Sequence, residues 1–266
     1  MAQSPAPRAL APCRVPGLVM KPAPTPRTLV FVTAVSRVEV LAQHLSRSPC
    51  IQGRRCELIA SFNAPSAAHA FDLAQASRPA DPGTWYVWVH QDVHLPGDWD
   101  RRFLARLGEA QRALPGLAVA GVYGVRGAGA RAVRAGHVID RGRDLREPAP
   151  LPCVVDSLDE LLIAVRADAG LRFDPALGFD FYGTDVVLQA QAAGWQAAVV
   201  DACCSHASDT PARGPFPPGL MERVGASGDA FERKWRHRLP LTTPCFDIHA
   251  PGDVATAIRT LQGPSA

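Results

Sequence analysis

The sequence predicts an α/β fold with a mostly parallel central sheet and helices on both faces. Apolar segments rich in β-branched or aromatic residues at 28–35, 57–62 and 85–89 predict three strands, and a helical pattern separates each from the next. The first segment is apolar nearly throughout, as expected of a strand covered on both faces. This alternation favours a parallel sheet, because a crossover between parallel strands is usually a helix.

Composition narrows the class of protein. The 266 residues are 47% hydrophobic and 20% charged, enough for one large core or two small ones. The net charge is only +3, no Lys/Arg block stands out and the aromatic residues are not interleaved with basic ones, so we expect no nucleic-acid partner. We find no run of 18 apolar residues and no secretory signal, and the seven cysteines form no Cys-x-x-Cys pair. We therefore expect a soluble cytoplasmic protein without a transmembrane segment, with reduced cysteines.

The first hundred residues read as alternating strands and helices after a tail. Residues 1–27 contain seven prolines and predict a disordered or extended tail. Ser36 is a candidate N-cap for a helix over 37–46, and Ser66 for a helix that ends near Ala76. The segment 85–89 then ends at a cluster of polar residues, followed by a predicted helix over 98–113.

The middle of the chain is harder to interpret. Residues 117–125 predict a strand interrupted by Gly121 and Gly124. The segment 127–132 loosely matches the Gly-x-Gly-x-x-Gly/Ala fingerprint, but no helix follows it, so a mobile loop or irregular hairpin is favoured over a dinucleotide site. Residues 154–167 fit either a helix with a Ser157/Glu160 capping box or a buried strand over 161–165.

The last third of the sequence predicts one helix and one strand clearly, and the sequence after them has less regular patterns. Thr184 is a candidate cap for a helix that runs to Ala193 and ends at Gly194, and 195–200 predicts a strand. A Pro/Gly loop over 209–218 precedes a helix over 222–236. We therefore expect a single domain over 28–240 and a C-terminal tail over 241–266.

Three polar clusters follow, or lie between, predicted strands, where a parallel sheet brings loops to one edge. A divalent metal could be shared by Asp92 and His206, since carboxylate and imidazole both bind Mn²⁺ and related ions, although a lone histidine is more often structural. Asp185, at a helix start, could be a capping residue or a carboxylate that takes a proton from an alcohol. The clusters are His90/Gln91/Asp92, Asp180/Tyr182/Asp185 and Ser205/His206.

The order of these motifs resembles the GT-A-fold nucleotide-sugar glycosyltransferases, in particular their family-2-like bacterial branch. The resemblance covers about residues 28–208. It is carried by the segments 29–36, 61–66 (Ser-Phe-Asn-Ala-Pro-Ser), 89–96 (Val-His-Gln-Asp-Val-His-Leu-Pro), 179–185 (Phe-Asp-Phe-Tyr-Gly-Thr-Asp) with the helix to Gly194-Trp195, and 205–206. The resemblance also favours the strand over 161–165.

The resemblance implies roles for matching positions. His90-Gln91-Asp92 occupies the family's Asp-x-Asp position, so Asp92 and the later His206 would hold Mn²⁺ or Mg²⁺ at the diphosphate. Asp185 would be the general base, with Asp180 the alternative. The nucleotide would be lined by Thr33, Ala34, Ser36, Asn63, His90 and Gln91. Because His90 replaces the family's first acidic residue, the identity of the nucleotide stays open. In the last helix, Phe231, Lys234, Trp235 and Arg236 would either approach the acceptor or, as we favour, hold the helix to the core.

The expected function is metal-dependent transfer of a sugar from a nucleoside-diphosphate-sugar to an acceptor hydroxyl on a glycan, a lipid-linked molecule or a protein. An alternative is a catalytically silent sugar-nucleotide-binding or scaffold protein on the same fold, which the histidine at position 90 keeps open. A nucleotidyltransferase is disfavoured, because residues 33–37 contain no glycine for a phosphate loop.

Overall fold

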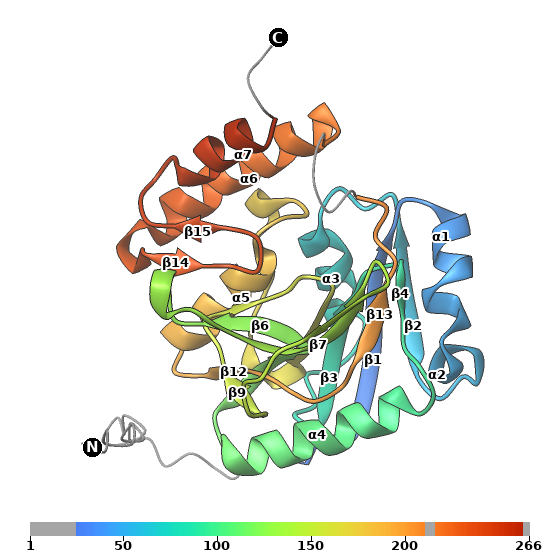
Figure 1. The fold of residues 1–266 in the computed structure, drawn as a ribbon. Coiled ribbons are helices and arrows are strands. Elements are labelled where there is room, and N and C mark those ends of the chain that lie inside the picture. The colour runs from blue at the N-terminus through green and yellow to red at the C-terminus, as the bar shows by residue number, and fades with distance from the viewer. Residues whose placement is uncertain (1–24, 211–215, 263–266) are drawn as a thin grey trace, which may run out of the picture.

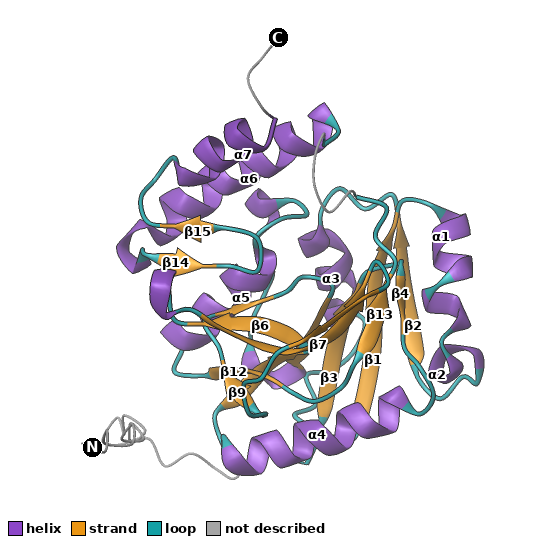
Figure 2. Ribbon diagram, in the orientation of Figure 1, coloured by secondary structure: helices purple, strands orange, loops and turns teal. Residues whose placement is uncertain are grey.

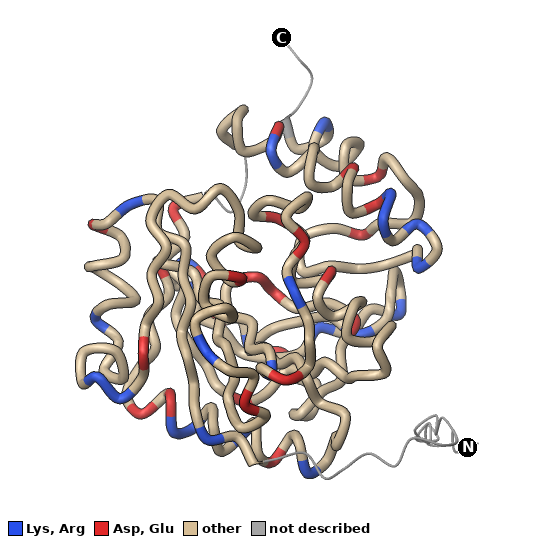
Figure 3. The backbone as a smooth tube through the Cα atoms, turned by 180° about the vertical axis from the view of Figure 1, so that it is seen from behind, with Lys and Arg blue, Asp and Glu red and all other residues tan. Residues whose placement is uncertain are grey.

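The computed structural model describes residues 25–210 and 216–262 and confirms the α/β fold class (Figure 1). The proline-rich segment predicted as a tail lies outside the described residues up to position 24. Within the described ranges, no helix combines the length and apolar character needed to span a bilayer. Basic and acidic residues are interspersed along the described backbone (Figure 3).

The central sheet has seven strands in the order β2-β1-β3-β11-β5-β12-β9. The strands are β1 (Thr28–Val35), β2 (Glu57–Phe62), β3 (Thr84–Val89), β5 (Leu117–Gly121), β9 (Cys153–Val154), β11 (Leu162–Arg166) and β12 (Gln196–Val199). β1 pairs in parallel with β2 and β3, and β5 pairs in parallel with β12. Only β11 and β9 run against the other five. The carboxyl ends of β1, β2 and β3 therefore lie at one edge of the sheet.

Helices cover both faces of this sheet (Figure 2). Alternate residues of β1 face opposite sides, so Phe31 lies in one core and Val32 in the other. The Phe31 core contains α1 (Val38–Gln43), α2 (Pro49–Gln52) and α4 (Trp99–Ala113). The Val32 core contains α3 (Ala67–Ala76) and α5 (Tyr182–Ala192). The predicted cap is confirmed for α3, where the Ser66 hydroxyl accepts from the His69 N–H at 3.1 Å.

A second sheet lies across the first and has the strand order β10-β6-β7-β13-β4, with β8 paired to β7. Its strands are β4 (Val93–His94), β6 (Tyr123–Arg126), β7 (Val133–Asp140), β8 (Arg143–Arg146), β10 (Ser157–Leu158) and β13 (Cys204–His206). The single strand predicted over 117–125 is therefore wrong: β5 and β6 belong to different sheets. Gly124 allows the close approach, since a Cβ there would lie 2.5 Å from the Ser157 carbonyl oxygen. The segment after it forms an irregular β6–β7 hairpin, as favoured above.

One local prediction near α5 is confirmed and another is wrong. Residues 162–166 form β11 between β3 and β5, which confirms the strand favoured over 161–165, and Ser157 lies in β10, so the alternative capping box does not form. Thr184 does not cap α5. The helix begins at Tyr182, and Phe181 at its N-cap has φ +64° and no capping side chain. Instead the Glu160 carboxylate accepts from the Gly183 N–H at 3.1 Å, so a residue from another segment caps the helix.

The C-terminal part packs on the outer side of α5. It comprises α6 (Pro218–Trp235), β14 (Leu241–Thr242), β15 (Asp247–Ile248) and α7 (Asp253–Gln262). Residues 241–262, expected to be a tail, thus form two short strands and a helix. Helices α6 and α7 cross closely at Gly228, where a Cβ would lie 2.5 Å from a Val254 methyl group. Phe231 and Trp235 are buried in this third core, as expected of residues that hold the helix to the core.

Candidate metal and nucleotide site

A cavity of about 280 Å³ opens at the edge where β1, β2 and β3 end. The loop after β1 contributes Ser36, the loop after β2 contributes Asn63, and the loop after β3 contributes His90, Gln91 and Asp92. This arrangement follows from the parallel pairing of the three strands, which brings their carboxyl ends together. The complete lining is Ala34, Val35, Ser36, Asn63, Ala64, Trp88, His90, Gln91, Asp92, Phe179, Tyr182 and Arg223.

Gln91 holds two of these loops together. Its side-chain oxygen accepts from the backbone N–H groups of Ser36 and Arg37, each at 3.2 Å, and its Nε2 donates to the Ser36 hydroxyl at 2.8 Å. The Arg37 guanidinium in turn pairs with Asp209 at 2.6 Å. The middle residue of His90-Gln91-Asp92 therefore fixes the loop after β1, in addition to lining the cavity.

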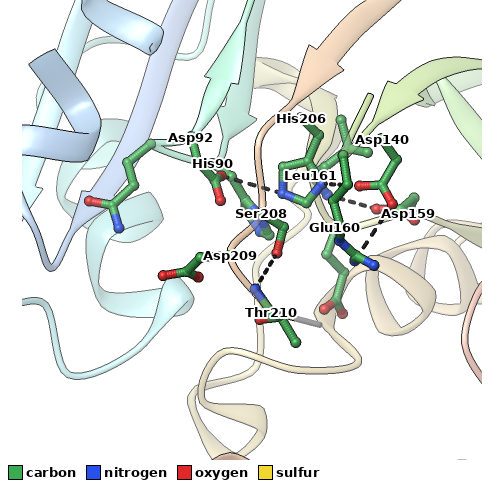
Figure 4. Close-up of polar contacts among 12 residues, drawn as sticks. His90, Asp92, Asp140, Asp159, Glu160, Leu161, His206, Ser208, Asp209 and Thr210 are labelled. Carbon is green, nitrogen blue, oxygen red and sulfur yellow. Dashed lines mark hydrogen bonds and ion pairs between the residues drawn. The ribbon is translucent and has the colours of Figure 1, made fainter. Parts of the chain in front are cut away.

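Three side chains from two segments form a possible metal site at the cavity wall (Figure 4). His90 and Asp92 follow β3, and His206 ends β13, which pairs with β4 directly after Asp92. One ligand atom from each of the three side chains lies within 4.8 Å of the others. His206 Nε2 lies 3.3 Å from Asp92 Oδ1. This set of two imidazoles and one carboxylate fits a divalent metal ion.

Electrostatics couple Asp92 and His206. Burial opposes protonation of His206, but hydrogen bonds to Asp140 and Asp92 outweigh it and raise the histidine's pKa to about 9. Burial acts to raise the pKa of Asp92, but the hydrogen bond and the charge of His206 lower it to about 2. Without a metal, a protonated imidazole thus balances the carboxylates, and a divalent cation would replace that proton.

Asp140 supports the site from behind and was not predicted from the sequence. It ends β7, which pairs in parallel with β13 so that Asp140 lies opposite His206. Its Oδ1 lies 2.9 Å from His206 Nδ1, on the side of the imidazole away from Asp92. A carboxylate on the second nitrogen is how proteins commonly orient a metal-binding histidine. The Gly/Arg-rich sequence before Asp140 gave no sign of the strand that positions it.

His90 is held by Tyr182, the first residue of α5. The Tyr182 hydroxyl lies 2.9 Å from His90 Nε2. Burial, and next the charge of His206, lower the pKa of His90 to about 4, so its imidazole is neutral at pH 7. A neutral imidazole is the form that binds a metal. Tyr182 belongs to a predicted polar cluster, but its link to His90 depends on how α5 packs.

Arg223 brings a positive charge from α6 to the cavity. Its guanidinium donates two hydrogen bonds to the Asp180 carboxylate, both at 3.0 Å, and the Ser227 hydroxyl donates a third at 3.2 Å. Asp180 therefore lies beside the cavity lining, between Phe179 and Tyr182, but is engaged by an arginine. No sequence pattern singled out Arg223, because it lies after a Pro/Gly loop on a different helix.

Asp185 does not reach the cavity. Its side chain has no exposed surface, and its Oδ1 lies 2.7 Å from both Trp235 Nε1 and Lys234 Nζ. Gln189 Nε2 donates to the other oxygen at 2.6 Å. This geometry does not fit the expected role of Asp185 as general base, because no acceptor hydroxyl can approach the carboxylate. It joins α5 to α6 instead.

The structure thus brings most of the predicted site residues to one cavity. Ala34, Ser36, Asn63, His90, Gln91 and Asp92 line it, and His206 contacts Asp92 behind it. Thr33 does not line it: its side chain is fully buried within β1. Asp180 is adjacent and Asp185 is remote.

Comparison with known proteins gives distant similarities. None of the protein-family models searched matches this chain. A protein of Fuscovulum blasticum described as "ATP synthase subunits region ORF 6" is 29% identical over 150 residues, which is 52% of this chain and 57% of that protein.

The solved structures it resembles are more remote in sequence. A GalNAc-T7 structure with UDP, GalNAc and Mn²⁺ has a TM-score of 0.44 at 12% identity, covering 80% of this chain and 52% of that one. TarS (residues 1–349) of S. aureus with UDP-GlcNAc has a TM-score of 0.43 at 9% identity, covering 77% and 67%. A197 from STIV has a TM-score of 0.39 at 14% identity, covering 66% and 82%.

Proposed function

We propose that this protein is a metal-dependent glycosyltransferase that moves a sugar from a nucleoside-diphosphate-sugar to an acceptor hydroxyl. The observation that carries the proposal is the convergence of His90, Asp92 and His206 at the wall of a cavity lined by the ends of β1, β2 and β3. The order of motifs in the sequence, which resembles family-2-like glycosyltransferases, adds the substrate class.

The cavity suits a nucleotide next to a cation. Its volume of about 280 Å³ is near the lower end of the range for small-molecule pockets. Ser36 and Asn63 offer polar groups to the cavity, and the Asp92 carboxylate lines it as well. We expect the nucleoside near Ser36 and Asn63, and the diphosphate near Asp92, His206 and Arg223.

The chemistry needs positive charge at the leaving group. A divalent ion held by His90, Asp92 and His206 would stabilise the negative charge that develops on the departing diphosphate. The guanidinium of Arg223 adds a fixed positive charge in the same cavity. Gln91 keeps the loop after β1 in place beside the nucleotide through its bonds to Ser36 and Arg37.

Asp180 is the better placed of the two carboxylates for taking the acceptor proton. It lies between two residues of the cavity lining, whereas Asp185 is fully buried against Lys234 and Trp235. Arg223 holds the Asp180 carboxylate in place with two hydrogen bonds, both at 3.0 Å.

One observation favours a second function, sugar-nucleotide binding without transfer. Both carboxylates that could act as a base are engaged by cationic side chains, Asp180 by Arg223 and Asp185 by Lys234. A protein of this kind would keep the metal and nucleotide site and lack a free base. Both functions therefore predict binding of the metal and the nucleotide sugar, and only the glycosyltransferase predicts turnover of the nucleotide sugar.

The test is release of nucleoside diphosphate from a panel of nucleotide sugars in the presence of Mn²⁺. Wild-type protein should turn over at least one donor, and Asp92→Ala should abolish that turnover while remaining folded. Asp72→Asn, at an exposed carboxylate on α3, is the matched control and should behave as wild type. Equal turnover by wild type and Asp92→Ala would refute the proposal. Metal-dependent donor binding with no turnover by wild type would establish the second function.

A further inference from the structure

A buried chain of hydrogen bonds runs from the core of the sheet to the metal site. Trp88 Nε1 donates to the Tyr182 hydroxyl at 2.9 Å, the same hydroxyl lies 2.9 Å from His90 Nε2, and it also lies 3.2 Å from the Glu160 carbonyl oxygen. Tyr182 is 1% and Trp88 2% exposed. The two rings pack edge to face, with centroids 5.6 Å apart. The buried, packed ring therefore keeps the Tyr182 hydroxyl next to these three partners.

If all three contacts of the Tyr182 hydroxyl are hydrogen bonds, the number of protons fixes their directions. A tyrosine hydroxyl has one proton to donate and two lone pairs that accept. The Glu160 carbonyl can only accept and the Trp88 N–H can only donate, so the tyrosine proton goes to Glu160 and one lone pair receives Trp88. The remaining lone pair faces His90 Nε2, and that contact is a hydrogen bond only if Nε2 carries the histidine proton. Nδ1 of His90 then keeps a free lone pair.

We propose that Tyr182 is a positioning residue that holds His90 in the Nε2–H tautomer and so makes His90 a metal ligand through Nδ1. This deepens the proposed function, because it rests on the metal site placed there. It assigns His90 to the metal rather than to the nucleotide. His206 is arranged in the same way: its Nδ1 faces Asp140 at 2.9 Å, and its Nε2 faces Asp92 at 3.3 Å. In each histidine, one nitrogen thus meets a partner outside the ligand set, Tyr182 for His90 and Asp140 for His206. The second nitrogen of His206 faces Asp92, which is itself a member of the ligand set, so that an ion would replace the proton between them.

The ligand set determines the class of ion. Two imidazoles and one carboxylate suit first-row transition metals such as Mn²⁺, Co²⁺ and Zn²⁺. Mg²⁺ prefers oxygen ligands in near-ideal octahedral geometry and gives up its water reluctantly. The site should therefore take Mn²⁺ or its transition-metal relatives and bind Mg²⁺ weakly.

The test measures binding of Mn²⁺ alone by calorimetry to the full chain after chelator treatment. Tyr182→Phe removes the hydroxyl and keeps the ring, and it should weaken Mn²⁺ binding by about 10–100-fold, the usual effect of losing such a supporting contact. Tyr86→Phe is the matched control: Tyr86 is on β3, 1% exposed, and its hydroxyl has no partner among the described residues. The control should bind Mn²⁺ as wild type does. Wild-type affinity in Tyr182→Phe would overturn the inference.

A second measurement needs no stable Tyr182 variant. The ¹⁵N shifts of histidine-labelled wild-type protein report which ring nitrogen carries the proton, and His90→Gln assigns the resonances. The inference predicts Nε2–H for metal-free His90, and an Nδ1–H tautomer would overturn it. Neither measurement uses a sugar donor. Failure of glycosyl transfer with these results intact would overturn the proposed reaction and leave the role of Tyr182 standing.

Discussion

Replacing Asp185 by alanine removes the carboxylate that joins α5 to α6. We predict that this variant loses stability rather than a chemical step. Trp235 Nε1 and Lys234 Nζ each lie 2.7 Å from Asp185 Oδ1, and Trp235 is buried. After the substitution, the indole N–H has no partner among residues 25–210 and 216–262, and within those ranges the remaining carboxylate partner of Lys234 is Asp174 at 2.6 Å.

The size of the loss follows from these contacts. An orphaned buried donor costs about 1–3 kcal/mol, and breaking a buried ion pair from one side costs about 3–5 kcal/mol. Because Lys234 is partly exposed and keeps one partner, we expect the free energy of unfolding to fall by about 3 kcal/mol. For a domain of this size, that corresponds to a melting temperature lower by roughly 10 °C.

The assay is urea unfolding followed by tryptophan fluorescence, together with donor turnover at a temperature where the variant is folded. Asp174→Asn is the control: Asp174 pairs with the same lysine at a more exposed position, and an asparagine oxygen can still accept from the Ala176 N–H, so the change should cost less than about 1 kcal/mol. An Asp185→Ala variant that keeps its unfolding free energy and loses all turnover would refute the reasoning. It would restore Asp185 as the general base.

The remaining predictions concern the metal site and the fold around it. In metal-free protein, folding raises the pKa of His206 from 6.5 to about 9. Protonated His206 therefore adds on the order of 3 kcal/mol to the free energy of unfolding, fully below pH 6.5 and progressively less as the pH rises to 9. His206→Gln should flatten the dependence of the free energy of urea unfolding on pH over that window. Asp140→Asn should weaken Mn²⁺ binding by about 10–100-fold in calorimetry without changing the fold. Arg223→Gln should weaken binding of nucleoside diphosphates by calorimetry and leave binding of the nucleosides unchanged; equal losses for both would argue against a phosphate contact. Gly183→Ala should lower the melting temperature measured by circular dichroism, since its Cβ would lie 2.6 Å from the Leu158 carbonyl oxygen.

Much of the central sheet could be predicted from the sequence because the signals are local. Strands β1, β2 and β3 are short apolar runs between turns, and the Ser66 cap is encoded within four residues. The break between β5 and β6 could not be predicted in the same way. It depends on Gly124 meeting Ser157, which lies 33 positions later.

Part of the candidate site could also be predicted, because some of its residues have local sequence signals. Asp92 and His206 follow strands and are metal-binding residue types, which a sequence pattern can indicate. Asp140 and Tyr182 act through contacts with these histidines across the fold, and only the packing of β7 and α5 reveals them. Asp185 shows the opposite case: its position at a helix start allowed either a capping residue or a proton acceptor, and the family resemblance favoured the general base, but Trp235, 50 residues away, buries it.

Calorimetric titration of nucleoside diphosphates into wild type and Asp92→Ala, each with Mn²⁺ or with a chelator, tests most directly whether metal and nucleotide share one site. The account predicts that Mn²⁺ tightens binding of at least one nucleoside diphosphate to wild type by roughly tenfold or more and has no such effect on Asp92→Ala. Binding that is equally tight with Mn²⁺ and with chelator, or the same Mn²⁺ enhancement in Asp92→Ala, would contradict it.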